Sequence, residues 1–531
     1  MKNLSRIAAL IVALAIGKAV FANDVATSNL SGEERALHVL NRLGYGPRPG
    51  DVNTVLQMGV ERYIDAQLHP ESIPLPNNLS ARLSNLPAIG MSAGEALSQF
   101  QMARQEARTR AANVAAKVDG ANDQMVNSTQ RTAIQTAEAR LLRAIESPRQ
   151  LEEVMVDFWF NHFNVFAGKG LDRALIASYE RDAIRPFALG RFRDLLGATA
   201  KHPAMLFYLD NWMSVAPGFA VGARRSSAAG KTNGLNENYA RELMELHTLG
   251  VDGGYSQNDV TELARMLTGW TFAPREMLRT GETFRFEPRR HDDGDKQWLG
   301  RRVAPNGVAE GEFALDVLAD HPATARHISY KLAQYFVADK PSPELVARLA
   351  QRFTQTRGDI RAVLKTLFAS PEFWSRSTLG GKFKTPYRYV ISSLRAADFN
   401  IINVRPLLGT LTQLGMPLYG CQTPDGYKNT EQAWLNPDAL SRRINFATSL
   451  ASGRLPLARP EQIVENLSSA GAMNLPEKVR PSASISTPID SVQLMTTLGS
   501  SVSLRTRDAV ATATPALRSA LILGSPDFMR H

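Results

Sequence analysis

The sequence contains a single cysteine, Cys421, among its 531 residues. One cysteine cannot form an internal disulfide, so the folded chain must be stabilised by packing rather than by crosslinks. The chain also lacks a Gly-x-Ser-x-Gly nucleophile elbow, a glycine-rich phosphate loop and a Cys-x-x-Cys-His haem-attachment motif. These absences argue against the common serine hydrolases, the phosphate-loop nucleotide enzymes and the c-type cytochromes.

Beyond the N-terminus, the sequence has no apolar run long enough to span a bilayer. Residues 1–22 instead predict a secretory signal peptide, with Lys2 and Arg6 before an apolar stretch over 7–17 and a small-residue cleavage site ending at Ala22. We therefore expect Sec-dependent export to the periplasm or the exterior, with cleavage after Ala22. A retained N-terminal anchor is the alternative.

Basic residues outnumber acidic ones, 61 to 51, and give a formal net charge of +10. Cleavage of the predicted signal peptide would remove three cations and no acids, which lowers this charge to +7. For an exported chain, this excess favours an anionic envelope polymer or a membrane surface over nucleic acid as a partner. A basic solvated surface without a specific partner is the simpler interpretation.

Helical periodicity recurs along most of the chain and predicts a mainly α fold, a large multi-helix bundle-like array. The exception is residues 271–312, where the alternation over Thr283–Glu287 predicts a small β-hairpin excursion. We expect the chain to be divided into a signal peptide (1–22), N-terminal helices and a loop (23–90), a polar helical arm (91–145), a central helical core with the candidate site and the β excursion (146–312), a C-terminal helical region (313–455), and a loosely ordered segment with closing helices (456–531).

The most informative stretch runs from Gly234 to Gly250, which the spacing of its apolar residues predicts to be a helix of about four turns. Asn236 is a plausible N-cap, and Gly250 is a plausible end. At helical spacing, Asn238, Glu242 and Glu245 fall on one face. An ordinary solvated helix with surface ion pairs is the alternative.

Other polar residues occur in apolar surroundings. Residues 159–166 form an aromatic cluster around Asn161 and His162, and a second apolar run ends at Asp210-Asn211. Because buried polar groups are normally hydrogen-bonded, His162 can equally be a core histidine. A further helix over 260–268 carries a Glu–Arg pair and is expected to pack antiparallel to the first. The candidate catalytic residues are thus Glu242, Glu245, Arg241, His247 and Glu262, and the candidate binding residues are Asn238, Asn161, Asp210, Asn211 and Arg265.

A divalent metal is possible, but the central helix cannot hold one alone. Glu242 and Glu245 have i, i+3 spacing, whereas His247 points to a different face, so neither the Glu-x-x-His nor the His-Glu-x-x-His arrangement is present. A metal would need ligands from elsewhere, and His162, His291 and Asp210 are the candidates. Without a metal, two carboxylates could act as acid and base if burial or a neighbouring charge raised the pKa of one of them.

Several motifs follow one another in a fixed order over about residues 33–455. They are His38–Gly46, Phe158–Phe163, Asn236–Gly250, Leu267–Thr271, the turn at His291 and Gly420–Tyr427. Together they resemble the bacterial family catalogued as domain of unknown function 1800. The resemblance implies an exported, mostly helical protein, often encoded beside a second exported family that is similar to sulfatases and alkaline phosphatases.

Two classes of function follow. In the first, the protein is a hydrolase or metal-dependent enzyme whose Glu/His/Arg centre acts on envelope or extracellular material. In the alternative, it is a non-enzymatic binding or escort partner of the co-encoded sulfatase/phosphatase-like protein, and its polar centre is a structural network. An active site would place Glu242, Glu245, Glu262 and a histidine around an open pocket, whereas a network would bury them with Arg241 and Arg265.

Overall fold

The computed structural model describes residues 30–113, 123–219, 234–458 and 488–531. The predicted signal peptide lies outside these residues. The described chain is mainly α-helical and contains two small antiparallel sheets, which confirms the predicted fold class. None of its helices is long and apolar enough to cross a membrane.

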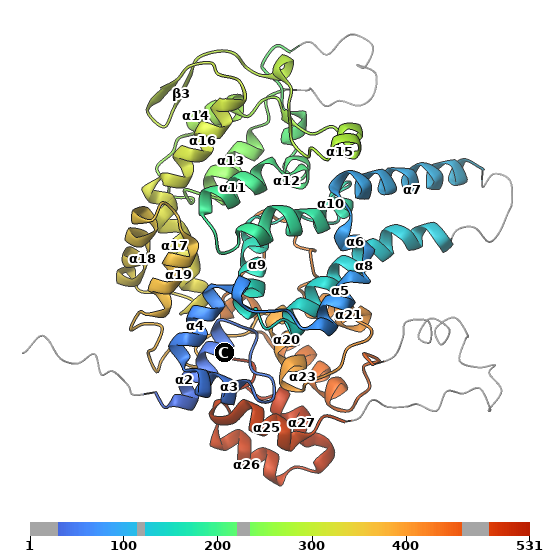
Figure 1. Ribbon diagram of the computed structural model, residues 1–531, viewed down its shortest axis with the longest axis vertical. Helices are drawn as coiled ribbons and strands as arrows, with labels where there is room; N and C mark the ends of the chain where they lie inside the picture. The colour runs from blue at the N-terminus through green and yellow to red at the C-terminus, as the bar shows by residue number, and fades with distance from the viewer. Residues whose placement is uncertain (1–29, 114–122, 220–233, 459–487) are drawn as a thin grey trace, which may run out of the picture.

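The N-terminal part is a series of short helices that lead to a projecting pair. Ser31 begins the first helix with a capping box, in which its side chain and that of Glu34 each accept a hydrogen bond from the other's main chain. In Figure 1 the last two helices of this part extend away from the body. The helices are α2 (Gly32–Arg42), α3 (Asp51–Met58), α4 (Val60–Leu68), α5 (Asn77–Ser84), α6 (Pro87–Gly90), α7 (Ala93–Asn113) and α8 (Asp123–Glu146).

The central part supplies most of the upper half of the molecule in Figure 1. Its aromatic and aliphatic residues are buried on nearly every helix, and Trp159, Leu195 and Leu243 are fully covered. The elements are α9 (Gln150–His162), α10 (Asp172–Ser178), η2 (Tyr179–Ile184), α11 (Phe192–Lys201), α12 (Pro203–Tyr208), η4 (Asn211–Met213), α13 (Glu237–Glu245) and α14 (Gln257–Met266).

The β excursion contains two strand pairs rather than the single predicted hairpin. β1 (Trp270–Thr271) pairs with β2 (Arg285–Phe286) across α15 (Pro274–Thr280), and β3 (Lys296–Trp298) pairs with β4 (Arg301–Val303). Leu299 and Gly300 turn the second pair with φ of 47° and 73°. Two successive positive φ values match the right-handed twist of a tight hairpin, which lies within the predicted region 271–312.

The C-terminal part begins with α16, which lies beside α14 in the upper part of the molecule, then packs beside and below α9 and ends in three helices at the bottom (Figure 1). The closing helices begin at Ser491, whereas the segment expected to be loosely ordered lies largely outside the described residues. The elements are α16 (Val308–Asp320), α17 (Pro322–Phe336), α18 (Pro343–Gln355), α19 (Ile360–Phe368), α20 (Pro386–Ala396), α21 (Arg405–Gln413), α22 (Glu431–Trp434), α23 (Pro437–Ala451), α25 (Ser491–Leu498), α26 (Leu504–Thr512) and α27 (Pro515–Leu523).

Helix α20 is buried along its whole length and ties the two ends of the chain together. Arg388 donates to the main-chain oxygens of Asn41 and Gly44 at 2.7 and 2.6 Å. Arg395 donates to those of Gly46 and Ile145 at 2.8 and 2.7 Å. The His38–Gly46 motif therefore has a structural role, because its carbonyl groups are the partners of two buried guanidinium groups.

Candidate functional site

The central acidic helix, α13, is shorter than the sequence predicts. Asn236 caps it by accepting from the main-chain N–H of Asn238, as expected, but the helix ends at Glu245 instead of near Gly250. The next turn widens, because the N–H groups of His247 and Leu249 bond to the oxygens of Glu242 and Met244, five residues back. As a consequence, His247 is buried in the core, away from the carboxylates.

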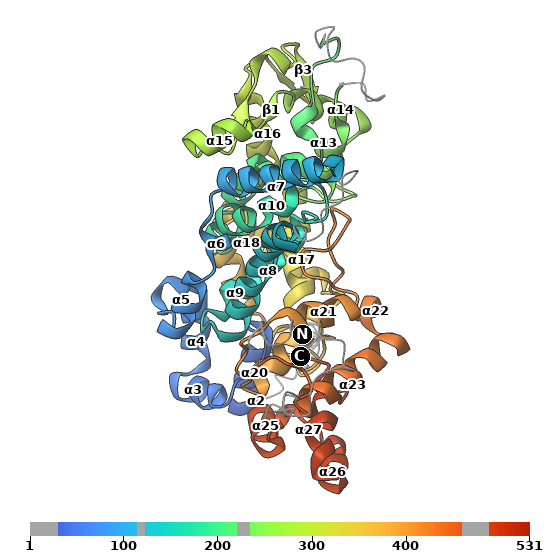
Figure 2. The same ribbon diagram turned by 90° about the vertical axis from the view of Figure 1, so that its right-hand side faces the viewer.

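An open cleft of about 760 Å³ lies beside the last turn of α13. Its walls come from α9, α13, α17, the start of α20 and the loop over 416–430, segments that are far apart in the sequence. In Figure 2, α17 and α9 lie between the level of α13 above and that of α20 below. Four of the predicted residues line the cleft, namely Glu242, Glu245, Asn161 and His162.

The loop that forms one wall is held by two asparagines of the aromatic cluster. The Asn161 side chain donates to the oxygen of Tyr427 at 2.8 Å and accepts from its N–H at 2.7 Å. Asn164 donates to the oxygens of Cys421 and Thr423 at 3.0 and 2.8 Å. Two motifs more than 250 residues apart are thus one unit, in which Asn161 positions a loop.

Two carboxyl groups of the cleft have pKa values displaced in opposite directions. Burial, the charge of Glu245 and the charge of Asp425 raise the pKa of Glu242 above its usual value. At Asp425, burial acts in the same direction, but hydrogen bonds from Lys428 and Thr423, both 2.6 Å long, outweigh it and lower the pKa. The cleft therefore presents a carboxyl group that tends to keep its proton and a carboxylate that does not.

A buried lysine adjoins these carboxyl groups. Burial and the charge of Lys428 lower the pKa of Lys331 to about 8. Its ammonium group forms no hydrogen bond or ion pair with the residues that the structure describes. Lys331 is therefore free to bind an anionic group that enters the cleft.

Three histidines surround Lys331. Rings of His162 and His247, and of His162 and His327, have centroids 6.2 Å apart. Burial, followed by the charge of Lys331, lowers the pKa of His247 to about 3 and that of His327 to about 4, and the pKa of His162 falls well below its usual value for the same reasons. All three are neutral at pH 7, which is the form that binds metals.

These histidines nevertheless do not form a metal cage. Among the residues that the structure describes, no three His, Cys, Asp or Glu side chains are arranged to hold an ion. The candidate ligands His162, His291 and Asp210 are also in separate places, because only His162 lines the cleft. A divalent metal thus remains a prediction without a ligand set.

Several other predicted residues lie outside the cleft. Asn238 is exposed, and Arg241 bonds to Gln257 at 2.6 Å on the solvent side of α13. Asp210 forms an ion pair with Lys169 at 2.9 Å. Asn211 is fully buried and donates to the main-chain oxygens of Leu267 and Trp270 at 3.2 and 3.3 Å, an arrangement typical of a structural residue.

Glu262, Arg265 and His291 belong to a second polar cluster between α14, β3 and α16. Arg265 forms ion pairs with Glu262 at 2.9 Å and with Asp292 at 2.8 Å. The Glu310 carboxylate lies 3.0 Å from His291 and 2.6 Å from Lys296. Each charge has a partner of opposite sign, which is the arrangement expected of a structural network.

Sequence reasoning missed three residues of the cleft: Asp425, Lys331 and His327. Asp425 lies in the motif Gly420–Tyr427, but a Pro-Asp-Gly turn on its own indicates only a change of chain direction. Lys331 and His327 are on α17 at i, i+4 spacing within an amphipathic pattern. Nothing in that pattern distinguishes them from solvated residues, so only the fold identifies them.

The structure thus defines a mainly α protein with an open cleft lined by carboxyl groups and a separate ion-pair network. The chain belongs to the family described as protein of unknown function (DUF1800), whose model matches residues 38–530. No curated protein and no solved structure matched it.

Proposed function

We propose that the cleft is the active site of a hydrolase that cleaves glycosidic bonds in an acidic polysaccharide outside the cytoplasm. The observation that carries this proposal is the pair Glu242 and Asp425, two carboxyl groups of one open cleft with pKa values displaced in opposite directions. A protonated carboxyl group and a carboxylate on either side of the scissile bond are the acid and the base that hydrolysis of a glycoside requires.

In this mechanism, Glu242 donates its proton to the leaving-group oxygen while Asp425 takes a proton from the attacking water. Glu245 acts through Glu242, because its negative charge helps to keep the Glu242 carboxyl group protonated. Tyr330, Tyr335 and Tyr427 also line the cleft and offer surfaces on which sugar rings can stack.

The acidic character of the substrate is inferred from the cations of the cleft. Lys331 has no ion-pair partner among the described residues, and a substrate carboxylate would provide one. Polysaccharides that contain uronic acids carry such a group on every sugar or on every second sugar. This inference agrees with the basic charge of the chain and with the predicted export.

The experiment measures the release of reducing ends from polygalacturonate, alginate and hyaluronate by the purified protein. We expect activity on at least one of them, and we expect Glu242→Gln and Asp425→Asn each to lower kcat by about 100-fold or more. Glu237→Gln is the matched control, because this residue of α13 bonds to Gln257 and Thr261 outside the cleft. Equal rates for the wild type and both cleft variants would contradict the proposal.

The second candidate function is binding or escort of a co-encoded exported sulfatase/phosphatase-like protein. It is favoured by apolar side chains at the lower end of the molecule, where Ile444, Leu517 and Leu521 are 50, 51 and 40% exposed on the contacting helices α23 and α27. The ion pair between Glu262 and Arg265 also agrees with the alternative in which the polar centre is a structural network. Unchanged partner binding by the Glu242→Gln variant would separate this function from catalysis.

A further inference from the structure

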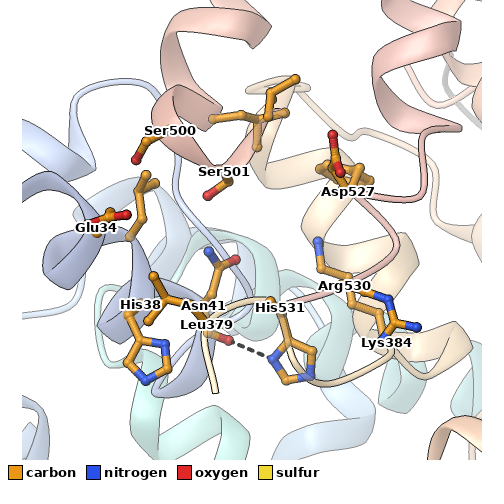
Figure 3. Close-up of a pocket in the computed structure, with 15 residues that line it drawn as sticks. Glu34, His38, Asn41, Leu379, Lys384, Ser500, Ser501, Asp527, Arg530 and His531 are labelled. Atoms are coloured by element: carbon orange, nitrogen blue, oxygen red, sulfur yellow. Dashed lines mark hydrogen bonds between the residues drawn. The ribbon is translucent and has the colours of Figure 1, made fainter. Parts of the chain in front are cut away.

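A second cavity, of about 190 Å³, lies at the junction of the two ends of the chain. It is bordered by α2, the segment 379–384, the residues that follow α25 and the C-terminal segment 527–531 (Figure 3). His531 adjoins both this cavity and the cleft, but the carboxyl groups proposed for catalysis line only the cleft.

Lys384 is the most unusual residue of this cavity. Its side chain is only 3% exposed, and its ammonium group lies 3.9 Å from the centre of the Phe528 ring. It forms no ion pair or hydrogen bond through this group with any residue that the structure describes. Burial and the nearby Arg388 and Arg443 lower its pKa well below the usual value. A buried cation without a partner is costly, so this position is suited to a ligand that supplies negative charge.

The opposite side of the cavity offers hydrogen-bond donors that are not in use. The side chains of Asn41, Ser500 and Ser501 border the cavity and form no hydrogen bond with the described residues. Figure 3 shows Asn41 and Ser501 across the cavity from Lys384 and Arg530. An amide, two hydroxyl groups and an ammonium group around one space can together bind several oxygen atoms of one anion.

The two carboxylates that border the cavity already have partners. Glu34 forms an ion pair with Arg376 at 3.0 Å and accepts from the Ser31 N–H at 2.8 Å. Asp527 accepts from the N–H and hydroxyl of Ser503 at 2.9 and 2.6 Å. Neither carboxylate forms an ion pair with Lys384, whereas Arg530 on the same side of the cavity is already paired with Glu431.

We propose that this cavity is a binding site for a small oxyanion, a phosphate or carboxylate group, with Lys384 as its ion-pair partner and Asn41 and Ser501 as hydrogen-bond donors. The bound anion would provide the negatively charged partner that Lys384 lacks. It would also bridge α2 to the segment 379–384 and the C-terminal segment, and so fasten the two ends of the chain.

The test is calorimetric titration of the full-length protein with inorganic phosphate and, separately, with sodium acetate, with sodium chloride as the control for ionic strength. We expect one saturable site for at least one of the two oxyanions and none for chloride. Whichever oxyanion binds shows whether the site takes a phosphate or a carboxylate group. We expect its binding to raise the Tm of the protein.

Lys384→Met keeps an apolar stem of similar length and removes the charge. We expect it to weaken oxyanion binding at least tenfold without lowering Tm in the absence of the anion, since it removes an unpaired buried cation. Lys365→Met, at a lysine whose side chain is 71% exposed on α19, is the matched control and should bind as the wild type does. Absence of saturable binding by the wild type, or equal binding by Lys384→Met, would overturn the proposal.

Discussion

At the scale of single residues, the cleft depends on how three neighbouring carboxyl groups affect one another. Glu245 lies about one helical turn after Glu242, and Asp425 comes from a loop distant in the sequence. The charges of Glu245 and Asp425 both act on Glu242, whereas Lys428 and Thr423 bond to Asp425. One group is thereby kept protonated at a pH at which the other is ionised.

The pH dependence of hydrolysis follows from these displacements. Activity requires protonated Glu242 and ionised Asp425, so it should fall as the pH rises through the elevated pKa of Glu242 and as it drops through the lowered pKa of Asp425. Glu245→Gln removes a negative charge beside Glu242, and we expect the alkaline limb of kcat to move to lower pH by up to about one unit. The measurement is kcat against pH for both proteins, and an unmoved limb would contradict the role of Glu245.

Residue patterns could predict part of this site. The i, i+3 spacing of Glu242 and Glu245 places them on one face of a helix whatever the fold, so their proximity was predictable. The partnership with Asp425 was not, because it depends on packing between residues almost 200 positions apart. The same limit explains why Glu262 and Arg265, which resemble a site in sequence, belong instead to an ion-pair network.

At the scale of elements, the loop 416–430 is positioned by α9. Gly426 lies closest to the helix, with φ of +70°, and a Cβ atom there would be 2.2 Å from the main-chain oxygen of Asn161. The glycine is therefore needed both for the backbone conformation and for the close approach of the loop. The segment that carries Asp425 would have to move if any side chain were present at 426.

We expect Gly426→Ala to destabilise the protein by about 2 kcal/mol or more and to abolish hydrolysis, since a left-handed conformation and a backbone clash add to each other. Gly409→Ala is the matched control. Gly409 is on α21, and a Cβ atom added there would meet no other atom within 4 Å, so alanine should raise stability by about 0.5–1 kcal/mol. Urea unfolding of both variants checks this prediction. An unchanged free energy of unfolding for Gly426→Ala would refute the close contact between the loop 416–430 and α9.

A second feature at this scale is the repeated Ser-Pro turn that ends α19 and α27. Ser370 and Ser525 each donate to the oxygen three residues back, at 2.7 and 2.8 Å, and each hydroxyl accepts from the N–H of the phenylalanine three residues on. The similarity of the two sequences thus corresponds to identical local bonding. Phe528 of the second turn covers Lys384, which links this turn to the proposed anion site.

At the scale of the whole molecule, the burial of histidines makes stability depend on pH. His38, His202 and His247 have pKa values lowered to about 3, that of His327 is lowered to about 4, and that of His162 is lowered well below its usual value, in each case mainly by burial. Below about pH 6.5 the unfolded chain takes up protons at these positions, whereas the folded chain does not. The free energy of unfolding must therefore fall as the pH drops.

We expect Tm to decrease continuously from pH 7.5 to pH 5, with each histidine contributing up to roughly 1 kcal/mol per pH unit in the lower part of this range. Asp172, Glu138, Glu152 and Glu242, whose pKa values are raised mainly by burial, act in the opposite direction and reduce the slope without reversing it. His38→Gln should make the dependence shallower, whereas His69, whose side chain is 44% exposed, provides the control His69→Gln. A Tm that is constant over this range would show that the histidines are not buried in the neutral form.

The fold class was predictable because helical periodicity and capping residues such as Ser31 and Asn236 act locally. The predicted end of α13 was wrong, and the β excursion has a second strand pair, in each case for a tertiary reason. The wide turn after Glu245 lets His247 and Leu249 enter the core, and Arg285–Phe286 pairs with Trp270–Thr271 from before α15. The end of α13 and the strand pairing both depend on contacts between distant residues, which no local sequence pattern contains.

The proposed activity depends above all on Glu242 holding a proton at a pH at which Asp425 has lost its own. This difference can be measured by a carbon-detected NMR titration of protein labelled at the side-chain carboxyl carbons, with the two resonances assigned from Glu242→Gln and Asp425→Asn. We expect Glu242 to titrate above 4.5 and Asp425 below 3.8, the usual pKa values for these groups. Titration of both groups at their usual values, or in the reverse order, would contradict the assignment of acid and base.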